Sequence, residues 1–202
     1  MHQPAPYVAP FQAMLPPNAR LLVQAGATDG ELARDYRKLY PASSVLVVEG
    51  DWLRAQQARD YAERVEQADL DTADGALFRR LEWADGWYFD ATLEQLADPL
   101  HVLRQVRKVI QFDACIVARV ANRAYWDAPA AAPRHGWTVN DLLALFQQAR
   151  FRVAGGVLLN PGPLPAHVES ALQRQAAASG GAPQALLEAA QPSHYLIKAV
   201  PA

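Results

Sequence analysis

Short apolar runs alternate with amphipathic stretches along almost the whole of this 202-residue chain. Each run is bounded by turn-forming or charged residues, a pattern typical of buried strands. The predicted strands cover residues 20–24, 45–48, 64–67, 87–89, 115–120, 151–159 and 194–200. Parallel strands require crossover connections, and helices usually supply them. The alternation therefore predicts an α/β fold with a mostly parallel sheet covered by helices on both faces.

The intervening stretches carry helix signals. Helices are predicted over residues 30–40, 52–61, 100–110, 139–149 and 167–190, with a shorter one at 11–15. Pro41 ends the first of these, because the residue before a proline disfavours the helical region. Thr138 precedes its helix with Asp141 at the third helical position, which indicates a capping box. Ser179-Gly180-Gly181 is expected to interrupt the last helix. The length fits a single domain over residues 1–202, in which residues 1–17 form a proline-rich N-terminal extension.

Composition excludes several classes of protein. The formal net charge is −2, so the chain lacks the strongly basic footprint of a nucleic-acid-binding protein. Cys115 is the single cysteine and lies in an apolar run, so it predicts a buried strand residue and no disulfide or multi-cysteine metal site. No metal-binding cluster is evident. No stretch approaches the roughly 20 apolar residues of a membrane span, and the N-terminus lacks signal-peptide features. We therefore predict a cytoplasmic protein that binds neither membrane nor nucleic acid.

The first predicted strand runs into a glycine turn, Gly26-Ala27-Thr28-Asp29-Gly30, which leads into a helix. In open α/β sheets the ligand lies beyond the carboxyl ends of the strands. Glycines allow a tight turn and a close ligand approach, and free N–H groups at a helix start favour polar or anionic groups. A turn without any ligand would be equally rich in glycine, so the turn alone does not decide between the two interpretations.

Acidic residues follow the next three predicted strands. Glu49 ends the second strand, 19 residues past Gly30. An acid in this register is placed to accept hydrogen bonds from ribose hydroxyls. Asp69 and Asp90, after the third and fourth strands, either line the same edge or are ordinary loop acids. A nucleotide-type ligand is therefore predicted. The spacing Gly26 to Gly30, with Thr28 between, does not fit the three-glycine dinucleotide fingerprint and disfavours a nicotinamide-dependent oxidoreductase.

Three segments resemble the class I S-adenosylmethionine-dependent methyltransferases, especially a bacterial group found with sugar and cell-surface glycan genes. They are NARLLVQAGATDG at 18–30, VLVVEGD at 45–51 and, most specifically, DGWYFDATLEQLADP at 85–99. The resemblance spans about residues 18–198. It implies a Rossmann-like three-layer αβα sandwich with a seven-stranded sheet whose final strand is antiparallel.

The resemblance also implies S-adenosylmethionine as the cofactor and assigns its contacts. The methionine part would lie beside the glycine turn, the ribose on Glu49, and the adenine near the loop after the third strand. The residues implied or expected at this site are Gln24, Gly26, Ala27, Thr28, Gly30, Glu49, Gly50, Asp51, Asp69, Leu70 and Asp90.

Several positions depart from the family pattern. Gln24 stands where the family has an acid, and its lost charge would weaken contact with the cofactor's ammonium group. Thr28 occupies a position where the family has glycine. The turn is expected to require positive φ there, and positive φ disfavours a residue with a β-carbon. Gln95 replaces a histidine, Gln111-Phe112-Asp113 replaces Pro-Gly-Gly, and Arg150 replaces a glycine. Two hypotheses stay open: an enzyme, or a methyltransferase-like domain without catalysis that serves as a binding or assembly module.

A methyl acceptor that carries a hydroxyl benefits from a general base. His135, in a predicted loop at the edge of the sheet, is the candidate base, although its sequence context favours a surface histidine. The acceptor is expected to be a small molecule or a glycan. The sequence leaves open whether the chain forms a homodimer or binds a protein partner.

Overall fold

The computed structural model of this protein describes residues 5–128, 134–159 and 162–202. Seven strands form one sheet in the order β3-β2-β1-β4-β5-β7-β6. The strands are β1 (Leu21–Ala25), β2 (Ser44–Glu49), β3 (Arg64–Gln67), β4 (Gly86–Asp90), β5 (Cys115–Ala121), β6 (Phe151–Leu159) and β7 (His194–Pro201). β1 to β5 are parallel, whereas β7 is antiparallel to both β5 and β6. The expected α/β sheet with an antiparallel last strand is confirmed.

Apart from α4 and the 3₁₀ turn η1, the helices occur where the sequence predicts them, with small shifts at the ends. They are α1 (Val8–Met14), α2 (Glu31–Leu39), α3 (Trp52–Ala58), α4 (Gly75–Arg79), the 3₁₀ turn η1 (Leu93–Gln95), α5 (Pro99–Val109), α6 (Val139–Gln148), α7 (Ala166–Ser179) and α8 (Pro183–Ala190). The sequence missed α4, because five residues are too few to show a helical period. Asp74 starts this helix by accepting hydrogen bonds from the backbone N–H groups of Ala76 and Leu77.

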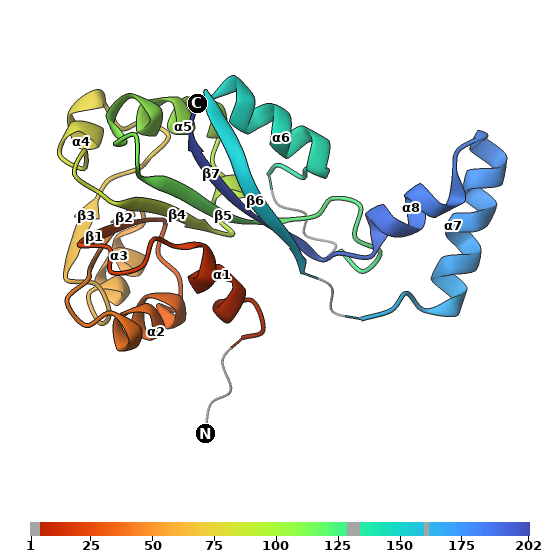
Figure 1. Cartoon of the computed structure of the whole chain (residues 1–202), viewed down its shortest axis with the longest axis horizontal. Helices are drawn as coiled ribbons and strands as arrows, with labels where there is room; N and C mark the ends of the chain where they lie inside the picture. Colours follow the sequence, from red (N-terminus) through yellow and green to blue (C-terminus); the bar gives the residue numbers. More distant parts are fainter. Residues whose placement is uncertain (1–4, 129–133, 160–161) are drawn as a thin grey trace.

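Two helical layers cover the sheet. α1, α2 and α3 lie on one face, and α4, α5 and α6 lie on the other, while α7 and α8 extend away from the sheet (Figure 1). Neighbouring residues in a strand point to opposite faces. Leu22 accordingly packs with Phe11 of α1 and Tyr36 of α2, whereas Val23 belongs to the core cluster that contains Val102 of α5. Two hydrophobic cores therefore hold the sheet, one on each face.

Local signals set the helix ends. Thr138 and Asp141 form the predicted capping box at the start of α6. α7 ends at Gly180, which has φ of 66° and caps the helix in the left-handed conformation. Cys115 is buried in β5, as expected, and its burial raises the pKa of the thiol. Across the described ranges, no helix combines the length and apolar character that a membrane crossing demands.

Candidate functional site

A cavity of about 610 Å³ opens at the carboxyl edge of the parallel strands. The loops after β1, β2, β3 and β4 form its walls, and Tyr7 before α1 and Arg119 of β5 complete it. Nine of the eleven residues expected at a cofactor site line this cavity: Gly26, Ala27, Thr28, Glu49, Gly50, Asp51, Asp69, Leu70 and Asp90. The remaining two, Gln24 and Gly30, are not among the lining residues.

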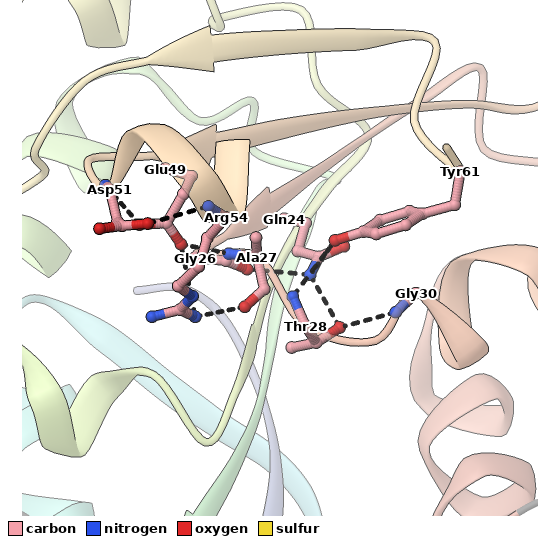
Figure 2. Close-up of polar contacts among 9 residues, drawn as sticks. All are labelled: Gln24, Gly26, Ala27, Thr28, Gly30, Glu49, Asp51, Arg54 and Tyr61. Atoms are coloured by element: carbon pink, nitrogen blue, oxygen red, sulfur yellow. Dashed lines mark hydrogen bonds and ion pairs between the residues drawn. The ribbon is translucent and has the colours of Figure 1, made fainter. Parts of the chain in front are cut away.

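Gln24 lies behind the glycine turn and supports it from within the protein. Its side chain is fully buried. The amide nitrogen donates to the carbonyl oxygen of Gly26 (2.9 Å), to Thr28 Oγ1 (3.1 Å) and to the Tyr61 hydroxyl (3.3 Å) (Figure 2). The amide oxygen accepts from the Tyr88 hydroxyl (2.6 Å). The structure therefore makes Gln24 a support of the loop, which differs from the direct ligand contact expected from the sequence.

The glycines of the turn make room for protein side chains. Gly26 and Gly30 have φ of 79° and 77°, a region that favours glycine. A β-carbon on Gly26 would lie 2.5 Å from Cγ2 of Thr92, and one on Gly30 would lie 2.2 Å from the ring of Tyr61. Gly30 also begins α2. Positive φ and close contact with Thr92 and Tyr61 are therefore sufficient reasons for glycine at these two positions.

Thr28 fits the turn without strain. The non-glycine residues with positive φ in the described ranges are Asn18, Ala91 and Arg150, so the expectation of positive φ at Thr28 was wrong. Its hydroxyl accepts hydrogen bonds from Gln24 and from the backbone N–H of Gly30 (Figure 2). The threonine therefore contributes an internal polar contact that glycine would lack.

Glu49 is the acid on which the nucleotide interpretation rests, and it is 7% exposed. Its carboxylate accepts from the backbone N–H of Ala27 (2.7 Å) and of Asp51 (2.9 Å). The guanidinium of Arg54 lies 3.4 Å from Oε2 and also donates to the carbonyl oxygen of Ala27 (Figure 2). A carboxylate offers about four acceptor positions. Glu49 can therefore hold the loops after β1 and β2 together and still accept a hydrogen bond from a ligand.

The β3 side of the cavity is built from short polar turns. Gly50 packs closely on Asp69, whose backbone Cα would lie 3.1 Å from an added β-carbon. Asp69 accepts from the backbone N–H of Asp71 (3.0 Å). Asp71 in turn accepts from the backbone N–H of Ala97 (2.8 Å), which joins the loop after β3 to the loop after η1. These contacts close one end of the cavity.

Asp90, Arg119 and Tyr7 form a cluster at the opposite end. Asp90 is 3% exposed; Arg119 Nε donates to its Oδ1 (2.5 Å), and the Tyr7 hydroxyl donates to its Oδ2 (3.4 Å). The Arg119 guanidinium also lies 4.0 Å from the centre of the Tyr7 ring. Burial raises the pKa of Asp90, while Arg119 acts in the opposite direction. Burial and the negative charge of Asp90 raise the pKa of Tyr7 to about 12.

Backbone strain occurs next to this cluster. Ala91, directly after Asp90, has φ of 56°, and its N–H donates to the carbonyl oxygen of Arg119 (3.0 Å). Residues in such sparsely populated regions persist where the surroundings fix them, often at functional sites. Tyr7, Arg54 and Arg119 were not among the residues expected at this site. The position of Arg119, a charged residue inside the otherwise apolar β5 segment, was the available sequence indication of a functional role.

His135 is not among the residues that line the cavity. Its backbone N–H donates to the carbonyl oxygen of Glu94 (3.0 Å), and its ring stacks on Trp137 with centroids 5.5 Å apart. Its assignment as a general base stays a prediction. Within the described residues, no group of three or more His, Cys, Asp or Glu side chains could hold a metal ion.

The sequence matches no protein-family model and no curated protein. Solved structures share its fold. An S-adenosylmethionine-dependent methyltransferase from Mesorhizobium loti is 20% identical, with a TM-score of 0.67 over 95% of this chain and 96% of that one. A chain from the complex of the Haloferax volcanii Trm112 methyltransferase activator with a methyltransferase is 17% identical, with a TM-score of 0.66 over 96% and 88%.

A third similar structure has a different activity in its name. The [4+2]-cyclase SpnF is 13% identical, with a TM-score of 0.64 over 96% of this chain and 79% of that one. The protein therefore has the Rossmann-like fold of S-adenosylmethionine-dependent methyltransferases. The fold does not by itself fix the reaction.

Proposed function

We propose that the cavity binds S-adenosylmethionine and that the protein transfers its methyl group to a small-molecule or glycan-type acceptor. The charge of the cavity wall carries this proposal. Six carboxylate side chains line the cavity against two guanidinium groups. The carboxylates belong to Asp29, Glu49, Asp51, Asp69, Asp71 and Asp90, and the guanidinium groups to Arg54 and Arg119. A concave surface of one sign attracts ligands of the opposite sign. It therefore suits a sulfonium cofactor that carries net positive charge.

The residues present fit this cofactor in two further respects. Trp87 and Tyr88 are buried in the two cores, so these aromatic rings leave the space above the glycine turn open. Thr92 lines the cavity, and its buried Oγ1 has no hydrogen-bond partner among the described residues. Buried polar atoms usually have a partner, and a bound ligand is one candidate partner for this hydroxyl.

Within this proposal, the chain's own residues divide the binding work. Glu49 accepts from ribose hydroxyls, with Gly50 and Asp51 beside it. Asp69 and Leu70 border the adenine, and the turn from Gly26 to Thr28 borders the methionine part. When bound, the cofactor supplies an electrophilic methyl group on a positively charged sulfur. The protein's contribution is to hold donor and acceptor in line, which can supply much of the rate acceleration.

Calorimetric titration tests the binding step. Millimolar S-adenosylmethionine should bind and raise the melting temperature, because a ligand that binds only the native state stabilises it. Glu49→Gln should weaken binding about 10- to 100-fold, the equivalent of a hydrogen bond to a charged group. Glu188→Gln, at an exposed position on α8, is the matched control and should bind like the wild type. NAD, whose pyrophosphate the acidic wall repels, should not bind. Absence of both heat and thermal shift with S-adenosylmethionine would refute the proposal.

A binding or assembly module without catalysis is the second candidate. One observation favours it: Glu49 and Asp90 are already paired with Arg54 and Arg119. The similar Haloferax volcanii structure is a complex with a protein activator, which makes a protein partner a reasonable proposal here. Methyl transfer to any acceptor, abolished by Glu49→Ala, would eliminate this candidate.

A further inference from the structure

A second cavity of about 420 Å³ adjoins the first one at Tyr7 and Arg119, which line both. Its other lining residues are Pro6, Leu158, Leu159, Ser193 and His194. The antiparallel insertion of β7 creates this site. Because β7 runs against β5, its first residue, His194, pairs with Ala121 at the carboxyl end of β5. A histidine near the C-terminus of the sequence is thereby placed beside the proposed cofactor cavity.

The hydrogen bonds around His194 favour one position for the ring proton. The Ser193 hydroxyl donates its single hydrogen to the carbonyl oxygen of Leu159 (3.0 Å). With the hydroxyl hydrogen directed at Leu159, the 3.1 Å contact between Ser193 Oγ and His194 Nδ1 is made by Nδ1–H as the donor. In a neutral ring, Nε2 is consequently the nitrogen with a free lone pair. The side-chain contact of His194 with Ser193 is made by Nδ1, which leaves Nε2 for the acceptor.

We propose that the second cavity binds the methyl acceptor, a compact and mainly apolar compound with a hydroxyl group, and that His194 Nε2 takes the hydroxyl proton during methyl transfer. The inference rests on the proposed function. Pro6, Leu158 and Leu159 provide apolar surface for the body of the acceptor. His194 is one of the polar residues in the cavity wall, together with Tyr7, Arg119 and Ser193, and its Nε2 is the group assigned to the acceptor hydroxyl.

The step balances in atoms and charge. The acceptor oxygen forms a bond to the methyl carbon as the sulfur–carbon bond breaks, and the bonding pair stays on sulfur. The hydroxyl proton moves to Nε2, so the positive charge of the sulfonium ends on the imidazolium. Burial, together with the positive charge of Arg119, lowers the pKa of His194 to about 4. The imidazolium therefore returns its proton to water readily, and the ring is neutral before the next cycle at neutral pH.

The cavity can be tested with 2-naphthol, a fluorescent probe with an apolar body and one hydroxyl. Wild-type protein should bind 2-naphthol, and Leu159→Trp, which fills the cavity, should weaken binding at least tenfold. Leu39→Trp, at a leucine on α2 that is 61% exposed, is the matched control and should bind like the wild type. S-adenosylmethionine affinity should be the same in all three proteins. Circular dichroism checks that each variant is folded.

The role of His194 has a readout independent of turnover. In the nitrogen-15 NMR spectrum of histidine-labelled protein at pH 7, His194 should be neutral with the proton on Nδ1. Ser193→Ala should shift its tautomer balance toward Nε2–H, because the hydroxyl acceptor is gone. In the presence of S-adenosylmethionine, His194→Gln should lower methyl transfer to 2-naphthol about 100-fold, the usual size of a general-base effect. Its affinity for S-adenosylmethionine should be unchanged.

The outcomes separate the two proposals. Absence of S-adenosylmethionine binding to the wild type refutes the proposed function. Normal S-adenosylmethionine binding, combined with 2-naphthol binding that is absent or insensitive to Leu159→Trp, overturns the acceptor site alone. An Nε2–H tautomer or a charged His194 at pH 7 overturns the base assignment. Loss of 2-naphthol binding in Leu159→Trp, together with the Nδ1–H tautomer and impaired turnover in His194→Gln, supports the inference.

Discussion

Gly26 offers a test of why the turn after β1 requires glycine. Its φ of 79° costs a residue with a β-carbon roughly 1–2 kcal/mol. The added β-carbon would also lie 2.5 Å from Thr92 Cγ2, a contact that must be relieved by movement of the backbone or of Thr92. Overpacking of this kind typically costs about 1–3 kcal/mol. Gly26→Ala should therefore lower the free energy of unfolding by about 2–5 kcal/mol.

The chain offers a matched control for the backbone part of this cost. Gly180 has a similar φ of 66°, but an added β-carbon there would meet nothing within 4 Å. Gly180→Ala should therefore cost only the backbone term, about 1–2 kcal/mol. In a Thr92→Ala background the steric part at Gly26 should largely disappear, since the methyl group has been removed. The double-mutant cycle should thus show a coupling of about 1–3 kcal/mol.

Urea unfolding followed by circular dichroism measures these free energies. Thr92 suits the cycle because its hydroxyl has no hydrogen-bond partner among the described residues, so its removal breaks no visible bond. If Gly26→Ala and Gly180→Ala cost the same, and Thr92→Ala changes neither, the glycine is not required by contact with Thr92. Ligand approach would then become the better explanation for glycine at this position.

Three further predictions concern charge and capping. The folded-state pKa of His194, about 4, lies below its ordinary value of 6.5, so the unfolded chain binds a proton first as the pH falls. The free energy of unfolding should therefore fall between pH 6.5 and 4, and it should fall less in His194→Gln. Urea unfolding repeated across this pH range measures both. Equal pH dependence in the two proteins would contradict the assignment. Arg119→Ala should destabilise the protein by about 3 kcal/mol, because it leaves Asp90 buried without its cation. Adding Asp90→Asn should recover part of this lost stability, measured by thermal unfolding. No recovery would argue against the ion pair. Thr138→Ala should lower the free energy of unfolding by about 1 kcal/mol, because it removes the cap of α6. Thr138→Ser keeps the hydroxyl and should lower it less. Equal losses in the two variants would argue against the capping contact.

Much of the fold was predictable because local patterns agree with it. Short apolar runs became strands, and amphipathic periodicity located α2, α5 and α6 within a few residues. The helix α4 escaped prediction because it consists of one turn whose start depends on Asp74. Gly180 ended α7 as expected, since a left-handed residue after a helix is a local requirement that sequence can display.

The site was predictable in outline and not in its partners. Gly26, Glu49, Asp69 and Asp90 share the cavity because parallel strands present their carboxyl ends at one edge. Gln24 looked like a ligand contact, yet its orientation depends on Tyr61 and Tyr88 from other elements. Hydrogen bonds between residues this distant in sequence leave no spacing signal.

The sequence by itself determined the alternation of strands and helices, the position of the glycine turn and the acids that follow the strands. These features follow from periodicity and backbone preference, which act over a few residues. The tertiary structure decided that Arg54 pairs with Glu49, that Arg119 and Tyr7 enclose Asp90, and that His194 reaches the edge of the sheet. Those contacts depend on strand order and on the reversed direction of β7, which are set by packing between segments far apart in the chain.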